Sequence, residues 1–117
     1  MSELGRMGRD GLIAGDYPTK SQEITVTGPA EFRRGDVVAA KGGEFALVDP
    51  EGEGGAELAI GIICDDVAVG DGESARAAMY VKGEFSQRAL RFGGGGEAEP
   101  HLRRMTEIGL IVRPTRV

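Results

Sequence analysis

Apolar residues are concentrated in the middle of the chain, between residues 58 and 96, and we expect the rest of the fold to pack on this stretch. It opens with the run Leu58–Cys64, whose length suits one buried strand, since strands commonly span roughly four to eight residues. Alternate residues place Leu58, Ile60, Ile62 and Cys64 on one side, and Ala59, Gly61 and Ile63 on the other. This pattern predicts a strand with both faces covered, and Gly61 predicts a bulge or the close approach of another backbone.

A second long strand is predicted at Ala75–Phe85, after an acidic, glycine-containing turn at residues 65–74. Its two sides differ: Ala77, Met79, Val81 and Phe85 share one side, and Ala78, Tyr80, Lys82 and Glu84 share the other. Such alternation is typical of a strand that packs on the core with one face and is half exposed on the other.

Shorter strands are predicted on both sides of this centre. They follow from β-branched or apolar runs bounded by turn residues: Ile24–Thr27 with Ile24 and Val26 inward, Val37–Ala40, Glu44–Val48 and Leu110–Val112. Gly42 and Gly43 separate two of them and can take the positive φ angles of a tight hairpin turn. Residues 31–36 are predicted to be a polar turn, and residues 49–57 an acidic loop.

Two helical segments complete the predicted fold. Ser86 is placed to cap a short turn of helix, with Phe85 packing on Leu90. A run of four glycines then precedes an amphipathic helix predicted at His101–Ile108, which Gly109 would end. The fold class is therefore mainly β with one or two short helices.

Residues 1–23 show neither strand nor helix periodicity, and we predict a flexible N-terminal arm followed by one domain at residues 24–117. Leu12 and Ile13 are its apolar anchors. A loose terminus without a role is one interpretation, because termini are usually poorly ordered unless they are tied down. The other is a segment that orders on a partner by adding a strand to the partner's sheet.

Composition sharpens this picture. The 117 residues include 20 glycines and no tryptophan, so the core is small and self-association is a plausible way to bury more surface. The net charge is −5 and basic residues are scattered along the chain, which argues against nucleic acid as a partner. No apolar run approaches the roughly 18 residues of a membrane span, so we expect no membrane partner and a cytoplasm-like compartment.

No catalytic or cofactor-binding constellation stands out. His101 is the one histidine, Cys64 is expected to be a small buried apolar residue, and Ser86 lacks the surroundings of a nucleophile. The acidic loops at 49–57 and 65–71 could offer oxygen ligands to calcium, but their spacing does not match the known loop pattern. We therefore expect no enzyme, no cofactor and no metal, and a small β-barrel module that binds a ligand or a metal stays open as the alternative.

Several strings taken in order resemble one known family. They are Gly35–Val38, Ala59–Val67, Met79–Phe85, the glycines at 93–96, and Ile108–Val112 after a short helix. This order resembles the head decoration proteins of tailed bacteriophages, the family of the lambda capsid decoration protein, over residues 34–112.

The resemblance implies a small β-barrel-like, or β-tulip, domain that forms homotrimers. Such trimers sit at threefold and quasi-threefold positions of the expanded head and stabilise it against the pressure of packaged DNA. The major capsid protein would be the partner, and the N-terminal arm would pair with its strands through the candidate residues Leu12, Ile13, Tyr17 and Ile24. The protein would be found on the outer surface of the virion capsid, and in the host cytoplasm during assembly.

Overall fold

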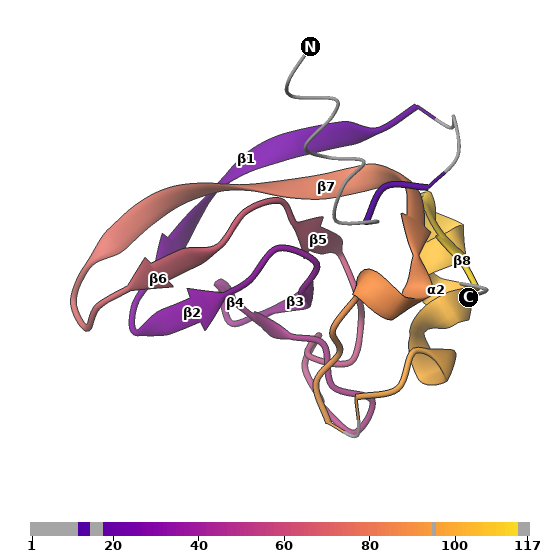
Figure 1. Cartoon of the computed structure of the whole chain (residues 1–117). Helices are drawn as coiled ribbons and strands as arrows, with labels where there is room; N and C mark the ends of the chain where they lie inside the picture. The colour runs from indigo at the N-terminus through magenta and orange to yellow at the C-terminus, as the bar shows by residue number, and fades with distance from the viewer. Residues whose placement is uncertain (1–11, 15–17, 95, 115–117) are drawn as a thin grey trace, which may run out of the picture.

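Strand β7 (Ser74–Ser86) pairs with three other strands of a six-stranded sheet in the computed structural model, which describes residues 12–14, 18–94 and 96–114 (Figure 1). The strand order is β1–β7–β5–β3–β4, and β8 also pairs with β7. The bounds of the other strands are β1 Lys20–Thr27, β3 Val37–Lys41, β4 Glu44–Leu47, β5 Gly61–Ile63 and β8 Leu110–Arg113. All of these pairings are antiparallel except that of β7 with β8.

The sheet is open, and the prediction of a barrel-like domain is wrong. Its outer strands are β1 and β4, which do not pair with each other within the described part of the chain. Closing a barrel requires every strand to have two bonded neighbours. The two strands that could have extended the sheet, β2 (Ala30–Phe32) and β6 (Val67–Val69), instead pair with each other in a separate two-stranded sheet.

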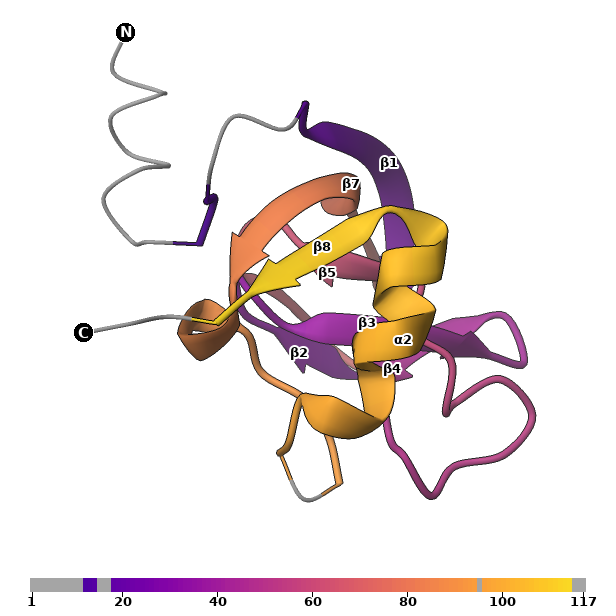
Figure 2. The ribbon, with the colours of Figure 1, turned by 90° about the vertical axis from the view of Figure 1, so that its right-hand side faces the viewer.

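Neighbouring residues of the central strands point into two different apolar clusters, so both faces of the sheet are covered. On one face lie helix α2 (Glu99–Ile108) and the short 3-10 helix η1 (Gln87–Ala89). In Figure 2, α2 lies at the front and η1 lies on the left. The α2-side cluster includes Val37, Ile62, Tyr80, Phe85, Met105 and Leu110. The opposite face carries the β2–β6 sheet, and its cluster includes Val26, Phe32, Val38, Ile63, Val69 and Met79.

Local signals placed several elements correctly. Gly42 and Gly43 have φ angles of 61° and 84° between β3 and β4, as the predicted hairpin turn requires. Helix α2 has a proline in its first turn and ends at Gly109, which takes the left-handed conformation expected of a helix end. Ser86 stands at the first position before η1, but its side chain caps no backbone group.

The central apolar run differs from its prediction. Leu58 is 42% exposed and lies in a bend before β5, which includes only Gly61–Ile63. Ile60 packs on the β2–β6-side cluster, opposite to Ile62. The three atoms nearest to an ideal Cβ atom at Gly61 all belong to the side chain of Met79, with its Cγ atom 2.2 Å from that position.

The predicted faces of the long strand are also partly wrong. Met79 and Phe85 were expected on one side, but they belong to opposite clusters, and Tyr80 is buried. The pairing of β1 with β7 shifts register between Lys20 and Ser21, and such irregularities change which way later side chains point. The first strand begins at Lys20 rather than Ile24.

Candidate functional site

Residues 12–14 are bound to the last part of β7, at one end of the sheet (Figure 1). The Ser86 N–H donates to the carbonyl oxygen of Leu12, and the Ala14 N–H donates to that of Glu84, both at 2.9 Å. These bonds flank an antiparallel bridge between Ile13 and Phe85. Leu12 is 1% exposed and belongs to the α2-side cluster, and burying a leucine contributes about 1.5–3 kcal/mol. Leu12 is thus part of the protein's own core.

Strand β8 lies along the other edge of the last part of β7. It pairs with Gly83–Ser86, and each edge of a strand accepts one neighbour, so residues 12–14 and β8 flank β7. The Glu84 side chain is nearly buried and forms an ion pair with Arg113 of β8, whose Nε donates to Oε2 at 2.8 Å. Segments near both ends of the chain are therefore fixed to one short part of β7.

A turn at residues 33–36 packs beside η1 and contains a second buried carboxylate. Asp36 is fully buried, and its Oδ2 accepts a hydrogen bond from the Arg33 N–H at 2.8 Å. Its Oδ1 lies 2.8 Å from Nε of Arg91, the residue that also pairs with Asp36 through the backbone. An ideal Cβ atom at Gly35 would lie 2.3 Å from the carbonyl oxygen of Ala89, so this turn fits closely against η1.

The side chain of Arg34 connects this turn to the sheet. One nitrogen donates to the Cys64 carbonyl oxygen at 2.8 Å and to the Tyr80 hydroxyl at 2.9 Å. Burial raises the pKa of the Cys64 thiol to about 11, and the nearby Asp65 carboxylate adds to the effect. Burial also raises the pKa of Tyr80. A thiol with so high a pKa is a poor nucleophile, because the thiolate is the reactive form.

His101 is fixed in the α2-side core. Its ring stacks on Phe92 with 5.3 Å between ring centres, and its Nε2 atom has no hydrogen-bond partner among the described residues. Burial lowers the pKa of this imidazole, although the Asp49 carboxylate partly opposes the change. No serine or cysteine contacts it through a hydrogen bond in the part of the chain described, so the histidine supports packing of α2.

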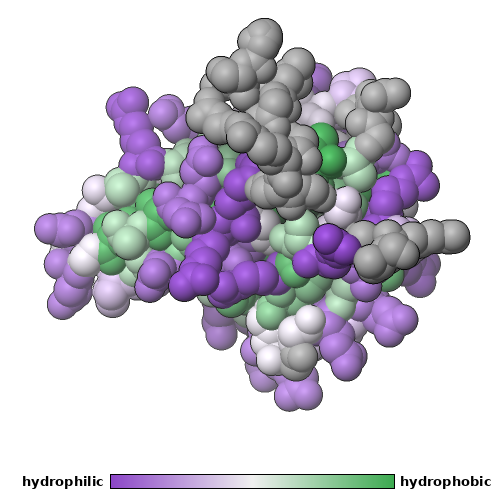
Figure 3. Space-filling view, viewed as in Figure 1, coloured by the Kyte–Doolittle hydropathy of each residue, from purple (hydrophilic) through white to green (hydrophobic). Residues whose placement is uncertain are grey.

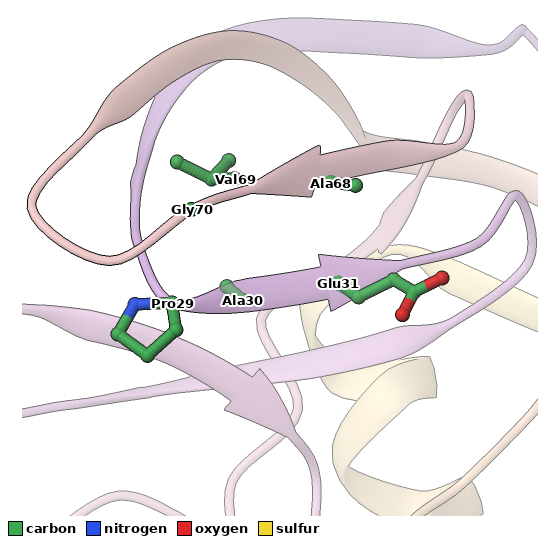
Figure 4. Close-up of a pocket in the computed structure, with 6 residues that line it drawn as sticks. All are labelled: Pro29, Ala30, Glu31, Ala68, Val69 and Gly70. Atoms are coloured by element: carbon green, nitrogen blue, oxygen red, sulfur yellow. The ribbon is translucent and has the colours of Figure 1, made fainter.

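The acidic loops do not converge on a metal site. Among the described residues, no group of three or more histidine, cysteine or acidic side chains could hold a metal ion. A hollow of the surface lies on the β2–β6 sheet; Figure 4 shows it, open to solvent and lined by Pro29, Ala30, Glu31, Ala68, Val69 and Gly70. It contains one ionisable side chain, Glu31. No described helix is long and apolar enough to cross a membrane.

The four predicted capsid contacts are found in different places. Leu12 and Ile24 are buried in the protein's own two clusters, and Ile13 is partly buried against the α2-side cluster. Tyr17 lies outside the described residues. Whether any of them touches a coat protein stays a prediction, but Leu12 and Ile24 already have partners in their own fold.

Sequence reasoning missed the two ion pairs that contain the buried carboxylates. Glu84 and Arg113 are far apart in sequence, and so are Asp36 and Arg91, so no local pattern pairs them. The one available signal was a charged residue, Glu84, next to Phe85 in an otherwise apolar strand.

The amino-acid sequence also matches a known protein family. Residues 6–105 match the family described as bacteriophage lambda head decoration protein D, which covers most of the 117 residues. No curated protein matches the chain. Members of this family are structural, non-enzymatic proteins of the phage capsid surface. The chain belongs to the family of the bacteriophage lambda head decoration protein D.

Proposed function

We propose that this protein cements the expanded head of a tailed bacteriophage. It binds the major capsid protein as homotrimers at threefold and quasi-threefold positions, on the outer surface, after its synthesis in the host cytoplasm. There it stabilises the head against the pressure of packaged DNA. The observation that carries the proposal is the family match over residues 6–105.

The fold is consistent with this role. Apolar clusters cover both faces of the sheet, so the protein offers a packed body to a partner. A trimer presents three equivalent contacts at once, and linked contacts bind more tightly than single ones because each raises the effective concentration of the others. Weak contacts per subunit are then sufficient for stable decoration.

The N-terminal segment is proposed to take part in binding from a fixed base. Leu12–Ala14 is bonded to β7, so the residues before Leu12 start from a defined position on the body. A fixed starting point lowers the entropy cost of placing a chain on a partner. Ile13 and residues 20–23, which lie within the proposed arm, pair with β7.

The test uses purified protein with phage heads that lack it. We expect co-sedimentation with expanded heads, no co-sedimentation with unexpanded heads, and better retention of DNA on heating after addition of the protein. Cryo-electron microscopy of the decorated heads should show density at the threefold positions. A protein that fails to bind expanded heads of its own phage would overturn the proposal.

A further inference from the structure

Helix α2 meets the sheet through a histidine that is buried without a polar partner. Strongly hydrophilic residues occupy much of the surface seen in Figure 3, whereas His101 is 1% exposed. Two acids are buried to a similar degree, Asp36 and Glu84, and each forms an ion pair with an arginine. The Nε2 atom of His101 has no hydrogen-bond partner among the described residues. Of these three side chains, the imidazole is the one held without a direct partner of opposite charge in the described part of the chain.

Taking up a proton changes what this ring needs from its surroundings. The neutral imidazole has one N–H group and one acceptor nitrogen, whereas the protonated ring has an N–H group on both nitrogens and a full charge. In the folded protein that charge would be buried, and Nε2 has no acceptor among the described residues. The ring of Phe92 stacks parallel to the imidazole at 5.3 Å and attracts a cation only weakly compared with water. The surroundings of His101 therefore favour the neutral ring.

The position of His101 in the helix adds to this preference. The residue lies in the first turn of α2, where the positive end of the helix dipole disfavours a cation. Arg104 follows three positions later and adds a second positive charge on the same side of the helix. Asp49, in the loop after β4, is the acid that partly opposes these effects from another element. The neighbouring acids Glu97 and Glu99 are exposed, so water and salt screen their charges from the ring.

Acid lowers the stability of the fold through this histidine. Burial lowers the pKa of His101 from the ordinary value of 6.5, so below that pH the unfolded chain binds a proton that the folded protein does not. The stability contribution of the neutral ring is complete above about pH 6.5 and is lost as the pH falls below it towards the lowered pKa. Over that range the folding equilibrium constant falls by at most about tenfold per pH unit.

The packing of α2 depends on this histidine more directly than the far side of the sheet does. His101 and Met105 are the buried residues of α2, and both belong to the α2-side cluster. Helix α2 contacts β8, which pairs with the last part of β7, and Figure 2 shows α2 and β8 together at the front. The β2–β6-side cluster contains no residue of α2 among those described. Weaker packing at His101 therefore acts first on α2 and β8.

We propose that His101 is an acid-sensitive switch built into the fold. Uptake of one proton by its imidazole loosens α2 and β8 from the sheet, while the β2–β6-side cluster stays packed. His101 is the one histidine among the 117 residues, and histidine is the side chain that ordinarily titrates between pH 5 and 8. One residue therefore sets the response of the protein to mild acid. The inference goes beyond the proposed function and does not depend on it.

The experiment compares the full chain with two variants that take up no proton at this position. His101→Phe keeps an aromatic ring against Phe92, and His101→Gln keeps a polar, uncharged side chain, so a packing defect in one variant is checked by the other. Met105→Leu is the matched control, because it alters the other buried residue of α2 and leaves His101 in place. Urea denaturation measures the folding equilibrium constant of all four proteins at about pH 7.5 and about pH 5.5, on either side of the ordinary pKa of histidine.

Between these pH values we expect the constant of the wild type and of Met105→Leu to fall by roughly five- to tenfold more than that of the two His101 variants. Carboxylates titrate alike in all four proteins, so their effects cancel in the comparison. An equal fall in the wild type and in the His101 variants would overturn the switch. So would a pKa of 6.5 or higher for His101 in the folded protein, measured by NMR titration of its ring.

Amide hydrogen exchange shows where in the fold the acid acts. After correction for the pH dependence of exchange itself, the amides of α2 and β8 in the wild type should lose protection at about pH 5.5 relative to amides in the pairing of β1 with β7. In His101→Phe this difference should disappear. A loss of protection spread evenly over all strands would mean that acid destabilises the protein as a whole, and would contradict a local switch.

Discussion

The first part of β7, Ser74–Val81, and its last part, Gly83–Ser86, belong to one strand but lie in different surroundings. The first part pairs antiparallel with β1 from Ser74 to Tyr80 and with β5 at Met79 and Tyr80, and its apolar side chains are directed to both clusters. The last part is held between residues 12–14 and the parallel strand β8, and contains the nearly buried Glu84. The first part lies within the regular sheet, whereas the last part is a junction at which residues 12–14 and β8 meet on one strand.

The largest loss of stability is expected when a buried apolar side chain is removed from either part of β7. Phe85→Ala in the junction should lower the free energy of unfolding by about 3–5 kcal/mol, and Met79→Ala in the first part by about 2–5 kcal/mol. Both residues are nearly or fully buried. Urea denaturation followed by circular dichroism measures both losses.

Amide hydrogen exchange at Ala14 and Ser86 distinguishes local opening of the junction from unfolding of the whole protein. The N–H groups of these two residues form the hydrogen bonds that flank the bridge between Ile13 and Phe85. Phe85→Ala should speed exchange at these two amides by more than the lower stability of the whole protein accounts for, whereas Met79→Ala should not. Identical local exchange in the two variants would mean that the junction does not open separately.

Leu12→Ala should cost about 2–5 kcal/mol, because it leaves a cavity in the α2-side cluster. Ile13→Ala serves as the neighbouring control and should cost less than about 1.5 kcal/mol, since its side chain is only partly buried. Thermal denaturation compares the two. If the two losses are equal, Leu12 is no more part of the core than its neighbour.

The ion pair of the junction gives a smaller effect. Arg113→Gln leaves the Glu84 carboxylate nearly buried without its cation, and should cost about 1–3 kcal/mol. Adding Glu84→Gln should recover part of that loss, because the unpaired charge is removed. Arg103→Gln, on the exposed surface of α2, should stay within about 0.5 kcal/mol. A double variant whose loss equals the sum of the single losses would show that the pair is not coupled.

The smallest expected effect is a pH dependence of the free energy of unfolding, caused by a group next to the first part of β7. The Cys64 N–H bonds the Ala78 carbonyl oxygen, and burial raises the pKa of the Cys64 thiol from 9.0 to about 11. Between these values the unfolded chain ionises while the folded protein keeps its proton. The stability contribution is therefore complete below about pH 9 and is lost as the pH rises towards 11.

Cys64→Ala should flatten this decline in urea denaturation between about pH 8.5 and 10.5, and leave the part caused by Tyr80. Unchanged pH dependence in the variant would mean that another group causes the decline. The junction variants Leu12→Ala and Arg113→Gln are the matched controls and should keep the wild-type slope.

Local patterns predicted the hairpin of β3 and β4, the long strand β7 and helix α2, because glycine turns, alternation and helix ends act between near neighbours. They missed β2 and β6, which have three residues each and are paired across more than thirty positions. They misplaced Leu58 because an apolar run does not reveal where its strand begins. The junction was missed for a related reason: Leu12 was recognised as an anchor, but a free strand edge specifies no particular partner.

The sequence by itself determined the family, the predominance of strands, and the absence of a recognisable catalytic motif, since these depend on order and residue type. The tertiary structure decided that the sheet stays open, that Leu12 belongs to the core, and that Glu84 pairs with Arg113. Each of these depends on contacts between residues distant in the chain. Such contacts follow from how whole faces are buried together, and no short window of sequence contains both partners.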